Sequence, residues 1–299
     1  MKAKTVAFAA FGGAAAVFLL YNGHYIVRYV WLNIGQPFEE WTPIAPSFPT
    51  VREVDWSNVT GWPYANGPVK ELWGKRLLML QSYTPNIAGY ADLSAKLCTY
   101  YCKSKGYRYK AIVSKGPSST RNPCWDKVFY TIQEFKYQGV EAWTPSEQKS
   151  GDNWIFWIDS DAAVSDYSKY IEAIGNMDDN ADLFICTSIY FSKNVNTGAM
   201  LFRMTPWMHR FLRAWWAWPN DRWHQTMCHE QSALDEMISK DHMGIVSSGK
   251  LALFGCTEFN STYQHGMRVK GKMVQHYRGC STEKRIAGFT SISSEGHSR

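Results

Sequence analysis

Apolar and polar positions follow two different periods over residues 71–282. Short segments rich in apolar, β-branched and aromatic residues predict strands at 76–83, 109–113, 154–161 and 183–187. Between these strands, apolar residues at helical spacing predict helices at 91–105, 125–137 and 166–174. This order with short connections is typical of a parallel sheet sandwiched by helices, so we predict an α/β fold. No G-x-G-x-x-G sequence follows the first strand, which disfavours the usual dinucleotide-binding fold.

The second half of this region continues the pattern with less regular spacing. Two further strands are predicted at 199–203 and 272–277. Two further helices are predicted at 206–218 and 229–234. The helix that Pro206 opens carries an aromatic stripe, which we interpret as core rather than as a sugar platform. Residues 283–299 are polar, and we expect them to form a frayed tail.

The N-terminus carries a separate apolar run. Lys2 and Lys4 precede an uncharged stretch that ends at Tyr21 and is rich in Ala, Phe, Val and Leu. We predict a signal-anchor transmembrane helix over 5–26 behind a cytoplasmic tail at 1–4. A cleaved signal peptide is the second interpretation and a buried helix the third. Residues 27–70 would form a stem before a single catalytic domain at 71–282.

Composition and short motifs indicate which partners and which cellular compartment to expect. The formal net charge of +6 fits a mildly basic surface, and no basic run argues for a nucleic-acid partner. The seven cysteines include no CxxC pair, which argues against a zinc site. The sequons at Asn58 and Asn260 would be glycosylation acceptors in a secretory lumen. We therefore expect a type II single-pass protein of the Golgi or another secretory-pathway membrane, and homo- or hetero-oligomerisation stays open.

The most informative stretch is the apolar run 154–158, which ends in Asp159, Ser160 and Asp161. Alternation in a strand would turn the two aspartates to one side, at the strand end where open α/β sheets bind ligands. Two like charges there are costly unless a cation joins them. The pattern favours a divalent-metal site that holds a phosphorylated substrate. Ser160 belongs to the same ligand-binding stretch, although alternation would turn its side chain the other way.

Several segments, taken in order, resemble motifs of glycosyltransferase family 34. This group includes yeast-type α-galactosyl- and α-mannosyltransferases and plant xyloglucan α-xylosyltransferases. The matching segments are Ser94-Ala95-Lys96 with Gly106-Tyr107, Trp125-Asp126-Lys127, Trp157-Ile158-Asp159-Ser160-Asp161-Ala162, Asn196-Thr197-Gly198 with Leu201-Phe202-Arg203, His229-Glu230-Gln231-Ser232-Ala233-Leu234, and His276-Tyr277-Arg278-Gly279-Cys280. A D-x-D sequence alone is common, but these segments in register cover residues 76–280. The chain departs from the family at His229, where an acid is usual.

The resemblance implies a Rossmann-like GT-A fold, a UDP- or GDP-sugar donor, Mn²⁺ dependence and retention of the anomeric configuration. It implies that Asp159, Asp161 and His276 bind the metal, and hard oxygens with one imidazole suit Mn²⁺. It places Glu230 and Gln231 under the donor sugar as the catalytic pair. Glu230 would bind sugar hydroxyls, and Gln231 would lie near the anomeric carbon on the face opposite the leaving group.

Six further residues are expected to contact the donor, namely Ser82, Tyr83, Lys96, Lys127, Asn196 and Gly198. The first two end a strand and would face the base or ribose. The two lysines are candidate phosphate or nucleotide contacts, and an ordinary solvated lysine is the competing interpretation. The last two would allow close backbone approach to donor or metal, although a simple turn explains the glycine equally well.

Three classes of function stay open at this point. The first is a retaining α-glycosyltransferase that moves a hexose or pentose to an oligosaccharide, polysaccharide or glycoprotein acceptor. The second is a non-catalytic, membrane-anchored glycan-binding or complex subunit, which would bind glycan without metal. The third is a nucleotidyl- or phosphotransferase, which would also use paired aspartates but does not account for Gln231 or His276.

Overall fold

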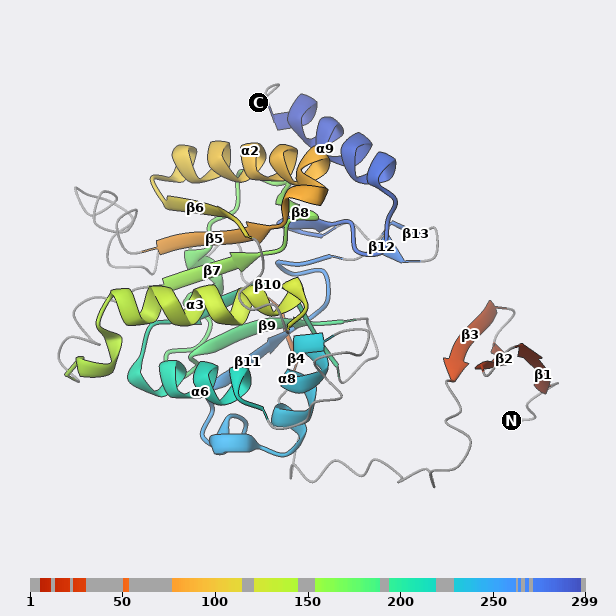
Figure 1. The fold of residues 1–299 in the computed structure, drawn as a ribbon, viewed down its shortest axis with the longest axis horizontal. Coiled ribbons are helices and arrows are strands. Elements are labelled where there is room, and N and C mark those ends of the chain that lie inside the picture. The colour runs from red at the N-terminus through yellow and green to blue at the C-terminus, as the bar shows by residue number, and fades with distance from the viewer. Residues whose placement is uncertain are drawn as a thin grey trace. The chain divides into compact units, whose positions relative to one another are not determined.

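The computed structural model of the protein describes residues 6–11, 14–21, 24–30, 51–53, 77–114, 121–144, 154–188, 194–218, 229–261, 263–264, 267–268 and 271–296. The chain divides into two compact units, Met1–Thr42 and Pro43–Arg299. The larger unit contains the predicted strands and helices of the α/β region (Figure 1).

A seven-stranded mixed sheet forms the centre of the larger unit (Figure 1). Its strands, in spatial order, are β4 (Val51–Arg52), β11 (Leu251–Phe254), β9 (Leu183–Thr187), β10 (Val195–Arg203), β7 (Trp154–Ile158), β5 (Leu77–Tyr83) and β6 (Arg108–Val113). β5 pairs in parallel with β6 and β7, and β11 pairs in parallel with β4 and β9.

The sheet departs from the predicted parallel arrangement at β10, which lies antiparallel between β7 and β9. The connection from Thr187 to Val195 is too short for the crossover of about a dozen residues that a parallel neighbour needs. As a result, the N-terminal end of β10 meets the C-terminal end of β7, where Ala199 pairs with Ile158.

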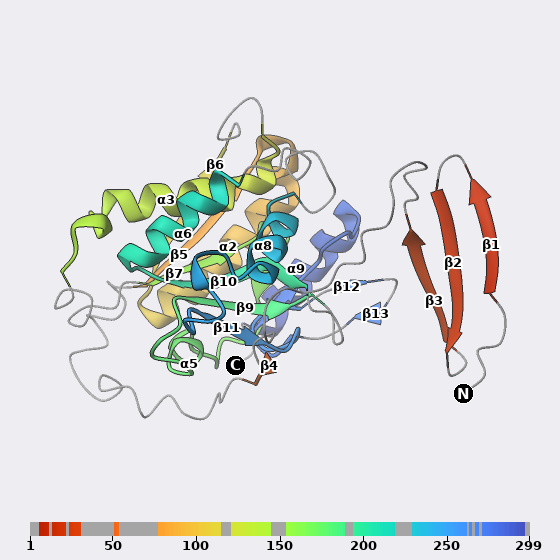
Figure 2. The same ribbon diagram turned by 90° about the horizontal axis from the view of Figure 1, so that it is seen from below.

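Helices cover both faces of the sheet, as predicted. α2 (Ala88–Lys105) and the short α5 (Glu172–Gly175) pack on the face where Met79 and Phe156 are buried. α3 (Asp126–Tyr137), α6 (Pro206–Trp216) and α8 (His229–Ser239) pack on the other face with Leu80 and Ile155. α3 and α6 lie side by side there, as Figure 2 shows. The aromatic stripe of α6 is core, since Phe211 and Trp215 are buried.

The larger unit also contains short strand pairs and 3₁₀ turns. Two small antiparallel pairs are β8 (Ala162–Val164) with β14 (Val274–His276) and β12 (Tyr263–Gln264) with β13 (Met267–Arg268). Among the described residues, 3₁₀ turns lie at Pro85–Ile87, Pro123–Trp125, Val140–Ala142 and His242–Gly244. The β8–β14 pair matters most for function, because it places residues near 161 beside residues near 276.

The predicted frayed tail at 283–299 is instead a helix, α9 (Thr282–Gly296). Phe289 and Ile292 are buried in a cluster with Tyr277 and Ala91, so α9 packs beside α2 (Figure 1). The apolar positions of α9 are few but share one helical face, and sequence polarity alone concealed them.

The N-terminal unit has three antiparallel strands, β1 (Val6–Phe11), β2 (Ala14–Tyr21) and β3 (His24–Val30), paired in that order. The sequence predicted a helix over 5–26, whereas the described residues of that range lie in these strands. The runs are separated in sequence by Gly-Gly and Asn-Gly dipeptides, which are typical of hairpin turns. None of the helices in the described ranges has the length and apolarity to cross a membrane. The predicted tail at 1–4, most of the predicted stem, and Asn58 lie outside the described residues.

Candidate active site

A cavity of about 450 Å³ lies where β5 and β7 end and β10 begins. Of the predicted site residues, Ser82, Tyr83, Lys127, Asp159, Ser160, Asp161, Asn196, Gly198, Glu230, Gln231 and His276 line it. Ser160 lines the cavity as well, because β7 ends at Ile158 and strand alternation no longer applies beyond it. The chain turns there, and Ala162 N donates to Asp159 O at 3.0 Å.

Lys96 is the predicted site residue that does not line the cavity. It is exposed on α2, and its ammonium lies 5.8 Å from the ring centroid of Tyr100. The interpretation of Lys96 as an ordinary solvated lysine therefore holds.

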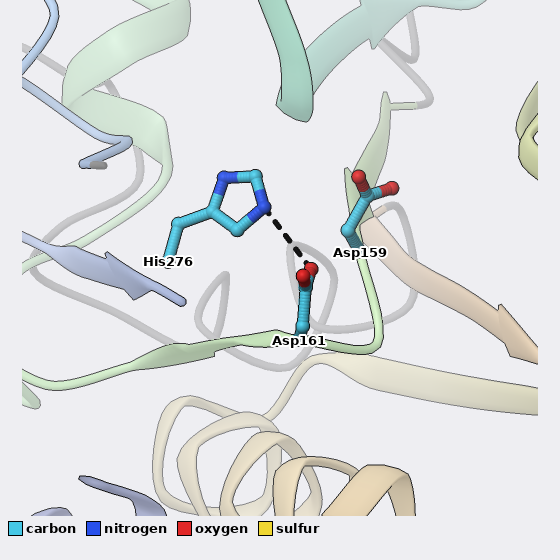
Figure 3. Close-up of side chains that lie close together, drawn as sticks. All are labelled: Asp159, Asp161 and His276. Atoms are coloured by element: carbon cyan, nitrogen blue, oxygen red, sulfur yellow. Dashed lines mark hydrogen bonds and ion pairs between the residues drawn. The ribbon is translucent and has the colours of Figure 1, made fainter. Parts of the chain in front are cut away.

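Two carboxylates and one imidazole converge in the cavity (Figure 3). Asp159 follows β7, Asp161 precedes β8, and His276 ends β14. One ligand atom of each lies within 4.8 Å of the others, and Nε2 of His276 is 3.0 Å from Oδ1 of Asp161. Carboxylate oxygens with a single imidazole suit Mn²⁺ or a similar divalent cation, so this donor set fits the metal that the sequence implied.

Backbone bonds hold the three ligand segments together. Asp159 N donates to Gly198 O at 2.8 Å, and Tyr277 N donates to Asp161 O at 2.8 Å. A Cβ added at Gly198 would lie 2.2 Å from Cε1 of His276 and 2.5 Å from its Nδ1. Gly198 is thus required by the close approach of the His276 ring and not only by a turn.

Lys127 is a buried cation between two carboxylates. Its Nζ lies 3.0 Å from Oδ1 of Asp159 and 2.8 Å from Oε1 of Glu230, and it also donates to Oγ1 of Thr197 at 3.1 Å. Burial alone would lower the pKa of Lys127, but the charges of Asp159 and Glu230 outweigh it and raise the pKa above its usual value. Lys127 therefore stays charged and links Asp159 of the candidate metal cluster to Glu230 near the start of α8.

Asp161 is held ionised from two sides. Nη2 of Arg285, on α9, lies 3.1 Å from its Oδ2, while His276 faces its Oδ1. Burial would raise the pKa of Asp161, but His276 and Arg285 together lower it below its usual range. Sequence analysis missed Arg285, because α9 was taken for a tail and no motif covers it.

Glu230 and Gln231 lie in the first turn of α8, and Thr197 forms a hydrogen bond with each of them. Oγ1 of Thr197 donates to Oε1 of Glu230 at 2.9 Å, and its backbone N donates to Oε1 of Gln231 at 3.3 Å. The preceding residue, His229, has a positive φ of 30°, a conformation that L residues rarely adopt. The N-x-G motif and α8 are therefore joined through the middle residue of the motif, whose role the sequence did not indicate.

Three of the residues expected to contact the donor already form hydrogen bonds within the protein. The hydroxyl of Tyr83 donates to Asp92 at 2.6 Å, and Oγ of Ser82 lies 3.4 Å from Oδ2 of Asp126. Asn196 accepts from Gly198 N at 2.9 Å through its Oδ1, so its side chain shapes its own turn while lining the cavity.

The sequon at Asn260 is not a surface acceptor. Asn260 is 1% exposed and its Nδ2 donates to Oδ1 of Asn196 at 3.0 Å. A glycan on this nitrogen is incompatible with the packing, so the weak support that the sequon lent to a luminal setting is withdrawn.

Comparison with solved structures identifies the architecture. A glycosyltransferase involved in the glycosylation of the major capsid of PBCV-1 superposes with a TM-score of 0.52 at 19% identity, over 72% of this chain and 98% of that one. The chain has a glycosyltransferase fold. It is of the GT-A-like kind, with helices on both faces of a largely parallel sheet.

Two other solved structures match at lower scores. The galactosyltransferase LgtC in complex with donor and acceptor sugar analogs has a TM-score of 0.44 at 12% identity, over 73% of this chain and 95% of that one. The glycosyltransferase GlyE of Streptococcus pneumoniae TIGR4 has a TM-score of 0.37 at 10% identity, over 60% and 45%. No protein-family model and no curated protein matches the sequence. Membership of family 34 thus stays a prediction.

Proposed function

We propose that the protein is a metal-dependent retaining glycosyltransferase that moves a sugar from a UDP- or GDP-sugar to a glycan acceptor. The observation that carries the proposal is that the Asp159–Asp161–His276 cluster and the start of α8 line one cavity, joined by Lys127. The glycosyltransferase fold supports it, as does the resemblance to family 34.

The metal-binding half of the site suits a diphosphate. Asp159, Asp161 and His276 would hold Mn²⁺, which supplies Lewis-acid stabilisation of the charge on the departing nucleotide. Lys127 adds a fixed positive charge beside Asp159, and its burial prevents water from screening that charge. Ser82 and Tyr83, at the end of β5, would bind the nucleoside portion.

The other half of the site suits the donor sugar. Lys127 and Thr197 fix Oε1 of Glu230, so its carboxylate would meet sugar hydroxyls without reorganising. Thr197 N orients the amide of Gln231 through its Oε1. An oriented amide dipole in the cavity would stabilise positive charge developing at the anomeric carbon. Retention by front-face attack and retention through a transient covalent adduct are both compatible with this arrangement.

The test is a panel of UDP- and GDP-sugars incubated with the purified full chain and Mn²⁺, with release of nucleotide as the measurement. We expect hydrolysis or transfer from at least one donor, lost on chelation of the metal. Asp161→Ala should lower the rate by at least about 100-fold, since it removes a metal ligand. Asp179→Ala, at an exposed position, is the matched control. Turnover that survives both the chelator and Asp161→Ala would falsify the metal assignment.

The same panel, measured as thermal stabilisation instead of turnover, separates the alternative functions. A glycan-binding subunit without activity would show thermal stabilisation by glycans and none by nucleotide-sugars with Mn²⁺. A nucleotidyl- or phosphotransferase would be stabilised more by a nucleoside triphosphate than by any nucleotide-sugar. Either result would replace the proposed function.

A further inference from the structure

Asn260 lies behind the His276 ring and is buried. It follows Phe259 in the loop after β11, and its side chain contacts the next residue, Ser261, and two residues distant in sequence, Asn196 and His276. It is not among the residues that line the cavity. Any role it has toward a ligand is therefore exerted through the residues it touches.

The orientation of the Asn260 amide is determined by its donors and acceptors. Ser261 N lies 2.8 Å from one end of the amide, and because a backbone N–H only donates, that end is the oxygen Oδ1. The other end lies 3.0 Å from Oδ1 of Asn196, which already accepts from Gly198 N. That end is therefore the NH₂ group, and a flipped amide would lose both hydrogen bonds.

This orientation determines which nitrogen of His276 carries a hydrogen. Nδ1 of His276 lies 3.2 Å from Oδ1 of Asn260, an atom that can only accept. Nδ1 must therefore be the donor. Nε2 is then the nitrogen left for a cation, which on binding would displace the hydrogen that Nε2 shares with Oδ1 of Asp161. Ser261 supports the same placement, since its Oγ accepts from His276 N at 3.0 Å.

We propose that Asn260 is a positioning residue that fixes the Nδ1–H form of His276 and so presents Nε2 to a divalent cation. Asn196 extends the same chain of contacts, because it holds the Asn260 amide and, through Gly198 N, the glycine that makes room for the ring. The inference rests on the metal site of the proposed function. It also makes Asn196 a positioning residue, which acts on the proposed metal ligand His276 through Asn260 and Gly198.

The test uses the full chain and Mn²⁺ alone, with free Mn²⁺ followed by electron paramagnetic resonance. Outer partners of ligating histidines typically contribute 10–100-fold to metal affinity, so Asn260→Ala should weaken Mn²⁺ binding by about tenfold or more. Asn260→Asp keeps the acceptor for Nδ1–H and should bind more tightly than the Ala variant. Asn180→Ala, at an exposed asparagine, should bind like the wild type.

A second measurement reads the histidine directly. In protein labelled with ¹⁵N-histidine, the His276 signal, identified by its loss in His276→Gln, should show a hydrogen on Nδ1. A bare Nδ1 overturns the proposal even if Asn260→Ala fails to fold. So does a folded Asn260→Ala variant whose Mn²⁺ affinity lies within twofold of the wild type.

The two proposals can fail separately. If no nucleotide-sugar is turned over but Asn260→Ala still weakens Mn²⁺ binding, the proposed function fails and the role of Asn260 stands. If sugar is transferred with Mn²⁺ and Asn260→Ala binds the ion as the wild type does, the reverse holds.

Discussion

At the scale of single residues, removal of the Lys127 side chain should lower stability markedly. It is buried between Asp159 and Glu230, so Lys127→Met would leave two carboxylates facing each other without a cation. Breaking one side of a buried ion pair typically costs about 3 kcal/mol or more, and we expect a loss of that size in the free energy of unfolding. Urea denaturation at neutral pH is the measurement.

The matched control is Lys240→Met. Lys240 pairs with Glu236 at 2.7 Å, but its side chain is 53% exposed, so the loss should stay below about 1 kcal/mol. Equal losses at the two positions would show that Lys127 is not the buried link between the two halves of the cavity.

The sequence indicated half of the residues that line the cavity, because these lie in motifs with a chemical reason for each residue type. It did not indicate Arg285, Asn260 or Thr197 as contacts of those residues. These side chains act on residues that are close in space but distant in the chain, and no local period or composition marks such a contact. Asn260 even carried a misleading signal, since its sequon suggested an exposed side chain.

At the scale of elements, α9 ties the C-terminal residues to the metal-ligand strand. Phe289 is 1% exposed and its ring meets that of Tyr277, the residue after His276, edge-to-face at 5.1 Å between centroids. Phe289→Ala should lower the free energy of unfolding by about 3 kcal/mol, through lost burial and the cavity left behind. Chemical denaturation checks it.

Ile286→Ala on the same helix is the control for Phe289→Ala. Ile286 is 37% exposed, and its truncation should change stability by less than about 1 kcal/mol. If both substitutions have similar small effects, α9 does not pack as the structure has it.

The central elements were predictable from sequence and the peripheral ones were not. β5, β7 and β9 are buried along their whole length and begin with at least four apolar residues in a row, a pattern that favours a buried strand. The direction of β10 depends on the length of the connection before it, which a strand pattern does not include. At the N-terminus, apolarity favoured a helix, whereas the Gly-Gly and Asn-Gly dipeptides mark the strand ends of the structure.

At the scale of the whole molecule, Asp235 should make stability depend on pH. Its Oδ1 accepts from Val195 N at 2.8 Å and so joins α8 to β10. Burial raises the pKa of Asp235 from 3.8 to about 7, although Val195 N–H and Arg278 act to lower it. The folded state therefore binds the proton more tightly than the unfolded state. The contribution of Asp235 is present below pH 3.8 and is lost as the pH rises to about 7.

Asp235→Asn should remove this slope, because an amide keeps the acceptor for Val195 N and cannot ionise. We expect the variant to be more stable than the wild type at about pH 8, with the difference shrinking toward pH 4. Urea denaturation at several pH values measures it. Asp179→Asn makes the same change of charge on an exposed side chain and serves as the control. A wild-type and variant pair with parallel pH profiles would contradict the assignment.

Asp161 and the side chains that contact it lie far apart in the sequence. Asp161 meets His276, 115 positions later, and Arg285, 124 positions later. During synthesis, the two aspartates leave the ribosome well before the residues that complete their surroundings. A divalent ion that binds only the completed cluster stabilises the finished fold and not its early intermediates. Uptake of the ion would then report that the last strand and α9 have docked, so it would mark completed folding in addition to its proposed role in the chemistry.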